Sequence, residues 1–353
     1  MLEQLIETYG EGPVLVAFGG LVGALFGAMA QHSRFCLRAA TIELADGQLG
    51  NRMAVWLVAF SAAVVCVQSA IWAGWLDVSE SRQLASLGSM SGAIIGGLMF
   101  GVGMILARGC ASRLLVLSAT GNLRAIVTGL VLTLVAQSAL RGALSPARET
   151  LASLWSVQGG AARDLLAQLG LSSGAAALIS VGVLCGALAF AYHSHSKFTH
   201  IAAAAGVGLA VALGWIATYA VAMNSFEVIA ISSITFTGPS TDTLMGLVNS
   251  TQLPLVFGVG LVPGVFFGAG GMALATKEAK IQRFEADTPM EYYLIGAALM
   301  GFGSMLAGGC AVGAGMSGGA IFALTAWVAV GAMWIGAMIT HTIMRQEVQL
   351  QKA

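Results

Sequence analysis

Residues 101–111 are Gly-Val-Gly-Met-Ile-Leu-Ala-Arg-Gly-Cys-Ala, and residues 301–311 are Gly-Phe-Gly-Ser-Met-Leu-Ala-Gly-Gly-Cys-Ala. Together with Ile95-Gly96 and Ile295-Gly296, they give nine identities in a 17-residue window at a constant offset of 200 residues. Each copy leads into a stretch of small residues, 117–122 in the first and 316–319 in the second. Gly, Ala and Leu are common in membrane chains, but a shared Gly-x-Gly followed by a shared Gly-Cys-Ala favours an internal duplication.

The composition points to lipid as the solvent of this chain. Of 353 residues, 57% are hydrophobic and only 9% are charged, with 16 Lys+Arg against 16 Asp+Glu. Soluble chains carry about 25% charged residues, so this composition excludes a cytosolic enzyme, a nucleic-acid binder and a disordered chain. Five cysteines without a CxxC pair argue against a disulfide scaffold and a structural zinc site. No metal or cofactor is expected.

Nine apolar runs are long enough to cross a bilayer, which needs about 20 residues per helix. We expect an all-α integral membrane protein with spans near residues 13–31, 53–75, 88–107, 123–145, 172–192, 201–222, 254–276, 290–307 and 320–342. An odd number of spans places the two termini on opposite sides of the membrane.

The basic residues favour one orientation. If the N-terminus is outside, four of them are outside, Arg82, Arg141, Arg148 and Arg163. The other twelve are then cytoplasmic: Arg34, Arg38, Arg52, Arg108, Arg113, Arg124, Lys197, Lys277, Lys280, Arg283, Arg345 and Lys352. Because Lys and Arg concentrate in cytoplasmic loops, we expect a multi-pass protein of the bacterial inner membrane with its C-terminus in the cytoplasm.

The offset of 200 residues pairs spans one to four with spans six to nine and leaves the fifth as a connector. Five spans separate the copies, so the two halves have opposite orientations, as in many transporters whose substrate site lies near the midplane. This divides the chain into residues 1–170, a connector at 171–200 and an inverted half at 201–353. Glycines at 19, 23, 27 and at 260, 264, 268 have GxxxG spacing, which we interpret as helix packing.

The segments after Cys110 and Cys310 are too short and too rich in small residues for ordinary loops. We expect re-entrant turns in which Gly109-Cys110 and Gly309-Cys310 open short half-helices. Helix N-termini attract anions, Gly permits close approach, and a thiol offers a polarisable S–H.

Other residues extend this candidate site. Ser118 and Ser317 are nearby hydrogen-bond donors that leave the passage open. At a shift of about 200 residues, Phe35-Cys36 corresponds to Phe236-Thr237, which adds Cys36 and Thr237. Cys66 and Cys185, in mid-helix, are interpreted as small buried hydrophobic residues.

The chain resembles the YeeE/YedE family of sulfur-compound transporters over nearly its whole length. The resemblance rests on three cysteine motifs, Ser-Arg-Phe-Cys36, Ala-Arg-Gly-Cys110-Ala-Ser and Ala-Gly-Gly-Cys310-Ala-Val-Gly. The resemblance implies an hourglass-shaped membrane protein that takes up thiosulfate along a route marked by Cys36, Cys110 and Cys310. Some relatives are associated with selenium or other sulfur species. It also implies a small cytoplasmic sulfur-carrier protein as a partner.

Several alternatives remain open from the sequence. The three cysteines also suit an intramembrane protein that exchanges disulfides or persulfides, and a purely structural subunit is a third possibility. Residues 146–170 suit either one or two interfacial helices or a surface linker. His193, His195 and His200 have no acidic ligand beside them and are interpreted as ordinary residues of a helix end.

Overall fold

The protein is almost entirely helical in a computed structural model that describes residues 2–249, 254–283 and 290–350. The long helices are α2 (Glu11–Ser33), α4 (Asn51–Trp72), α6 (Met90–Leu106), α8 (Leu123–Arg141), α11 (Ser173–His193), α12 (Phe198–Met223), α14 (Phe257–Ala275), α15 (Met290–Leu306) and α16 (Leu324–Leu350). The shorter helices are α1 (Leu2–Tyr9), α3 (Leu37–Ala45), α5 (Arg82–Ala85), α7 (Ala111–Ala119), α9 (Ser145–Ser153), α10 (Leu165–Leu169) and α13 (Thr237–Asn249). A 3₁₀ turn, η1 (Gly160–Arg163), and a π-helix, η2 (Gly313–Gly318), complete the helical elements.

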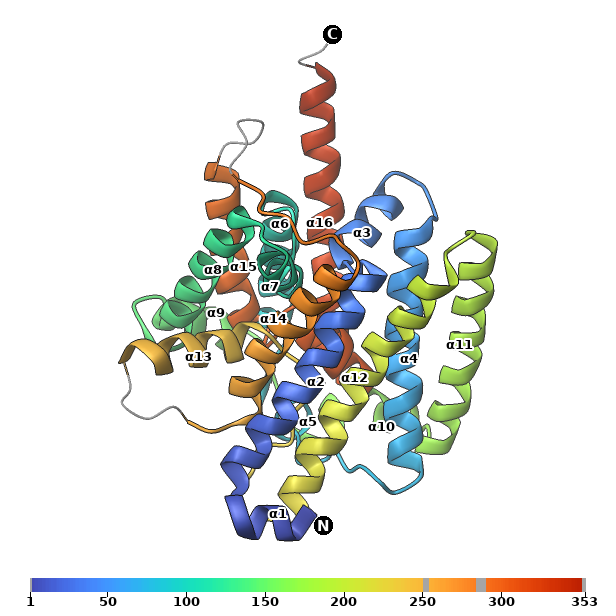
Figure 1. Ribbon diagram of the computed structural model, residues 1–353, viewed down its shortest axis with the longest axis vertical. Helices are drawn as coiled ribbons and strands as arrows, with labels where there is room; N and C mark the ends of the chain where they lie inside the picture. The colour runs from blue at the N-terminus through green and yellow to red at the C-terminus, as the bar shows by residue number, and fades with distance from the viewer. Residues whose placement is uncertain (1, 250–253, 284–289, 351–353) are drawn as a thin grey trace.

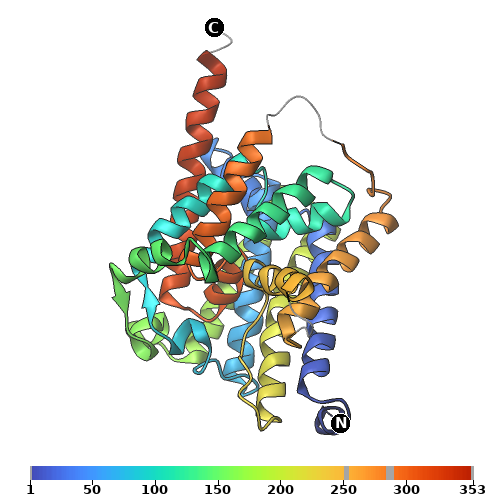
Figure 2. The ribbon, with the colours of Figure 1, turned by 90° about the vertical axis from the view of Figure 1, so that its left-hand side faces the viewer.

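Every predicted span overlaps one of the long helices. Eight segments in the described part of the chain are long and apolar enough to cross a membrane. The remaining predicted span corresponds to α15, which has 17 residues and lies against α6 and α8. The termini lie at opposite ends of the long axis, as an odd number of crossings requires (Figures 1 and 2). We refer to these ends as the N-side, which carries α1, and the C-side, where α16 ends.

The repeated glycines bring the backbones of α6 and α15 into contact. A Cβ added to Gly96 would lie 2.5 Å from the carbonyl oxygen of Gly303, and one added to Gly296 would lie 2.7 Å from that of Gly103. The next neighbours are also reciprocal, because Gly96 faces Ala307 and Gly296 faces Ala107. The duplicated motif therefore includes the residues that let these two helices touch, since only small residues allow such an approach in a membrane.

The two GxxxG stripes take part in helix packing, as predicted, and the structure shows that they pack against each other. A Cβ on Gly19, Gly23 or Gly27 of α2 would clash with backbone atoms of α14. The reverse holds for Gly260, Gly264 and Gly268 of α14, which face carbonyl groups of α2. These two helices run side by side from the N-side towards the C-side (Figure 1).

The helix contacts recur in the order that a duplication predicts. The contact between α2 and α14 corresponds to the contact between α12 and α4. In the same way, the contact between α6 and α16 corresponds to the contact between α15 and α8. Similarly, α3 lies on α4 and α16, while α13 lies on α14 and α8. This packing is what an inverted repeat requires, and the repeat and its division into halves stay predictions.

The segment 146–170 contains helices and is pinned to the bundle. It holds part of α9, the strand β2 (Ser156–Val157), η1 and α10, and β2 pairs antiparallel with β1 (Gly88–Ser89). Arg163 is buried and donates to the carbonyl oxygen of Ser86 at 2.7 Å and to Oγ1 of Thr325 at 2.7 Å. A plain surface linker would not have such an anchor.

Gly96→Ala and Gly296→Ala should each destabilise the protein, and to a similar extent. The added methyl group would meet the backbone of the partner helix, and overpacking of this kind costs about 1–3 kcal/mol. Thermal unfolding in detergent measures the loss. Gly182→Ala in α11 is the control, because a Cβ there meets nothing within 4 Å. Equal melting temperatures for all three variants would contradict the close contact.

Candidate functional site

Three of the shorter α-helices and a π-helix begin at or next to predicted site residues. Cys36 caps the N-terminus of α3, and Cys110 caps that of α7. Thr237 is the first residue of α13, and Cys310 lies three residues before η2. Cys110, Cys310 and Thr237 are buried, and Cys36 is half-buried. Since a helix N-terminus carries a partial positive charge and free N–H groups, the three α-helical starts offer donors to an anion.

The Cys110 thiol lies near the thiols of both Cys36 and Cys310. Its Sγ is 3.3 Å from Oγ of Ser112. The structure therefore brings the three predicted cysteines into one neighbourhood. The interpretation of Cys185 as buried is wrong, because it lies exposed on α11, which packs mainly on α4. Cys66 is half-buried in α4.

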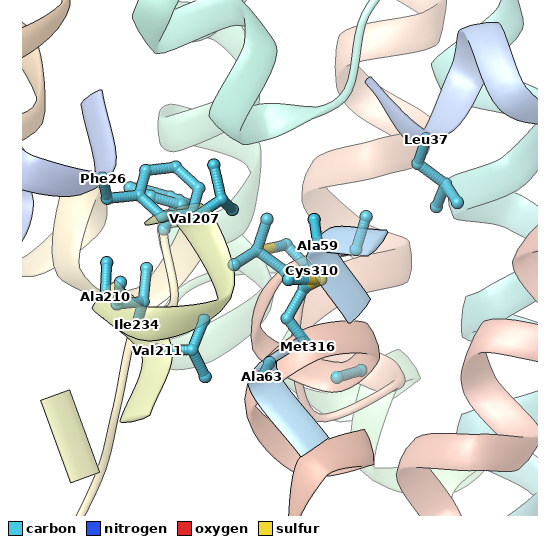
Figure 3. Packing of buried hydrophobic residues seen from close by; sticks show 14 of the residues in the cluster. Phe26, Leu37, Ala59, Ala63, Val207, Ala210, Val211, Ile234, Cys310 and Met316 are labelled. Atoms are coloured by element: carbon cyan, nitrogen blue, oxygen red, sulfur yellow. The ribbon is translucent and has the colours of Figure 1, made fainter. Parts of the chain in front are cut away.

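Cys310 is held by small polar groups. Its Sγ accepts from the backbone N–H of Gly313 at 3.5 Å and lies 3.9 Å from Oγ1 of Thr235. Figure 3 shows Cys310 packed among buried residues of α4 and α12, including Ala59 and Val207. The thiol thus faces hydroxyl and amide donors on one side and a closely packed apolar wall on the other.

The segment that carries Thr235 is extended and fixed at three points. Ser317 donates to the carbonyl oxygen of Ile234 at 2.6 Å, and Ser233 donates to that of Val211 at 2.6 Å. Thr218 in α12 both donates to the carbonyl and accepts from the N–H of Ser232. The bonds from Ser317 and with Thr218 satisfy backbone groups of a segment outside regular structure, as the interior of a membrane protein requires.

Cys36 and Thr237 each follow a phenylalanine at the start of a helix, Cys36 as the N-cap of α3 and Thr237 as the first residue of α13. The residues before them, Phe35 and Phe236, both contact the buried ring of Phe26, at 6.5 Å and 5.2 Å between ring centres. Oγ1 of Thr237 is buried and has no hydrogen-bond partner among the described residues. A buried donor without a partner is costly, so it is available to a ligand.

The remaining predicted residues have different settings. Gly109 and Gly309 follow residues with positive φ, Arg108 at 56° and Gly308 at 79°, and donate to Met104 and Ser304 at the ends of α6 and α15. Ser118 donates to the carbonyl of Leu114 in its own helix and lines a mostly apolar pocket between α7, α8, α13 and α14. Ser118 is thus set apart from the thiols.

Two adjoining cavities of about 600 and 210 Å³ open next to Cys310, and we call them together the N-side vestibule. They share Arg82, Gln83, Ser86, Arg148, Met305 and Gly308, and the larger one also reaches Thr235, Thr237 and Gly309. Arg82 donates to the carbonyl of Gly308 at 3.1 Å. Arg148 pairs with Glu149, whereas no carboxylate in the described chain pairs with Arg82 or Arg163.

Sequence reasoning missed the residues that complete this region. Thr235 and Ser112 touch two of the thiols, and Arg82 faces the turn before Cys310. Ser112 lies two residues after Cys110, so the motif itself could have indicated it. Nothing in the sequence marks Arg82, because its position comes from the packing of α5 against η1. No cluster of three or more potential metal ligands occurs in the described ranges.

Comparison with known proteins assigns the chain to a group of transporters. The profile of the family described as Sulphur transport matches residues 32–339. The chain is 26% identical over 341 residues to a thiosulfate transporter, TsuA, of Escherichia coli K12, covering 91% of this chain and 92% of that protein. It is 29% identical over 329 residues to the thiosulfate transporter TsuA of Spirochaeta thermophila, covering 88% and 93%.

Ser317→Ala should destabilise the protein more than a control serine does. The substitution leaves the buried carbonyl of Ile234 without its donor, and an unsatisfied buried group costs about 1–3 kcal/mol. Ser61→Ala is the control, because this buried hydroxyl donates only to carbonyls of its own helix, at Leu57 and Val58. Melting temperatures in detergent give the comparison, and an equal loss in both variants would refute the role assigned to Ser317.

Proposed function

Because the chain belongs to the Sulphur transport family, we propose that it takes up thiosulfate, or a closely related sulfur anion, across the bacterial inner membrane. The ion passes along a central route lined by Cys36, Cys110 and Cys310. The observation that carries this proposal is the setting of Cys110, which is buried at the N-terminus of α7 and lies near both other thiols.

The route has to replace the water that a dianion loses. Uncompensated burial of a charge costs tens of kcal/mol by the Born estimate. Backbone N–H groups at the starts of α3, α7 and α13 and the free hydroxyl of Thr237 are suited to the sulfonate oxygens. Neutral thiols donate weakly to the terminal sulfur, so they hold the ion loosely enough for it to move on.

The proposal places the entrance at the N-side vestibule. Arg82 and Arg163 lack carboxylate partners in the described chain, and the larger cavity reaches the turn that precedes Cys310. Glu80 and Asp242 also line the larger cavity, but neither pairs with Arg82 or Arg163 in the described chain, so the two guanidiniums remain able to attract anions. From there the ion reaches Cys310 first, then Cys110 and then Cys36. The thiols stay neutral in this scheme, because a thiolate would repel the dianion.

The released ion is removed on the cytoplasmic side. We place the C-terminus there, following the excess of Lys and Arg at the C-side; Lys352 of that set lies outside the described residues. A small sulfur-carrier protein of the kind associated with the family is the proposed recipient. The C-side part of α16 extends beyond the other helices (Figure 1) and offers it a surface.

Replacing each of the three thiols by alanine should reduce thiosulfate uptake several-fold, up to about tenfold. A thiol is a weak donor, so its bond falls within the range of about 0.5–1.5 kcal/mol for an ordinary hydrogen bond, and about 1.4 kcal/mol corresponds to a factor of ten. Labelled thiosulfate uptake and growth on thiosulfate as the sole sulfur source are the measurements. Cys185→Ala, on the exposed face of α11, should leave both unchanged.

Other outcomes of this experiment are equally informative. Unchanged uptake in all three variants would remove the relay. A disulfide or persulfide that accumulates on these cysteines during turnover would instead favour a thiol-exchange protein over a transporter.

The orientation is tested with reporter fusions at the C-terminus. A fused green fluorescent protein should fluoresce, because it folds in the cytoplasm, and a fused alkaline phosphatase should be inactive, because it needs the oxidising periplasm. The opposite pair of results would reverse the entrance and the exit assigned above. A phosphatase fusion in the loop after α4, on the N-side, is the positive control.

A further inference from the structure

The C-side ends of α2 and α14 hold a carboxylate among donors from the thiol-bearing turns. Nε2 of Gln31 donates to Oε2 of Glu278 at 2.9 Å, and Nη2 of Arg34 donates to Oε1 at 3.0 Å. Gln31 is 6% exposed, so its bond to the carboxylate is buried on the protein side. The pKa of Glu278 lies below its usual value because of the Arg34 guanidinium, so the group is an anion at neutral pH.

This arrangement follows from the packing of the two helices. Both α2 and α14 end in turns with a residue at positive φ, Arg34 and Lys277, and Glu278 donates its N–H to the carbonyl of Ala273. The glycine contacts between α2 and α14 set these two ends beside each other. The Glu278 carboxylate therefore reaches Gln31 and Arg34 without a long loop.

The donors belong to the same turns as two of the thiols. Arg34 lies two residues before Cys36, and Arg113, which also interacts electrostatically with Glu278, lies three residues after Cys110. Nη1 of Arg113 is buried and has no hydrogen-bond partner among the described residues. The backbone after Glu278 then crosses the end of α7, where Lys280 donates to the carbonyl of Thr120 and Gln282 to that of Gly121.

We propose that Gln31, Arg34 and Arg113 form a second binding site for a small sulfur oxyanion, at the C-side mouth, which the carboxylate of Glu278 occupies when the substrate is absent. The inference rests on the proposed transport function and adds the step that precedes release. A carboxylate and a sulfonate present similar acceptor oxygens to a guanidinium and an amide.

The ion pair between Arg34 and Glu278 is weak enough for an arriving anion to replace the carboxylate. The side chains of Arg34 and Glu278 are 50% and 36% exposed, and exposed ion pairs contribute little to stability. A dianion that arrives from Cys36 carries twice the charge of the carboxylate and can displace it. The returning carboxylate then displaces the ion towards the cytoplasm and hinders its re-entry.

Glu278→Gln tests the inference through the affinity measured from the C-side. In inside-out membrane vesicles, labelled thiosulfate should half-saturate transport at a concentration about three- to tenfold lower than in the native protein, because the competing charge is gone. Half-saturation from the N-side, measured in whole cells, should not change. Arg34→Gln should raise the thiosulfate concentration that half-saturates transport from the C-side. The double variant should lose the increase in affinity that Glu278→Gln gives.

Glu291→Gln is the matched control, because Glu291 is an exposed acidic residue at the same end, in the first turn of α15. An equal effect of Glu291→Gln would show that general surface charge is responsible and would overturn the inference. The inference would also be overturned if the half-saturating concentration from the C-side were unchanged in both Glu278→Gln and Arg34→Gln while the native protein transports normally. If Glu278→Gln fails to fold, the half-saturating concentration of Arg34→Gln from the C-side alone tests the inference. Absence of thiosulfate transport by the native protein from either side would instead refute the proposed function.

Discussion

The close contact between helix backbones at glycine is the constraint on which the rest of this structure depends. Lipid supplies no hydrophobic force between helices, so their association relies on van der Waals packing at short range. Gly96 and Gly296 give α6 and α15 this contact reciprocally, and two glycine stripes give it to α2 and α14. Because α6 and α15 end in the turns that carry Cys110 and Cys310, the same contacts also set where the thiols lie.

Much of the fold could be predicted because membrane burial leaves a strong signal. Every predicted apolar run overlaps a long helix, and the Gly-Cys motifs precede a short α-helix and a π-helix. The burial of Cys185 was predicted wrongly, because an apolar mid-helix position faces lipid as readily as protein and the sequence does not distinguish the two. Thr235, Arg82 and Glu278 were missed because their roles arise from segments that meet only after folding.

The two ends of the proposed route differ although the helix contacts recur. On the N-side, Gly308 accepts from Arg82, and the guanidiniums of Arg82 and Arg163 lack carboxylate partners in the described chain. On the C-side, the corresponding residue is Arg108, and Arg34 is neutralised by Glu278. The predicted duplication accounts for what the ends share, and these side chains account for how their electrostatics differ.

Such an asymmetry changes how readily each mouth fills, but it cannot set the direction of net flux. A dianion that enters a negative-inside cell works against about 4.6 kcal/mol per 100 mV, twice the value for one charge. Since about 1.4 kcal/mol corresponds to a factor of ten, equilibrium at 100 mV would hold the internal concentration about two thousandfold below the external one. No Asp, Glu, Lys or Arg lies at the predicted span centres to carry protons inward. Under the proposed function, chemical removal of the ion on the cytoplasmic side is therefore the driving force that agrees best with this chain.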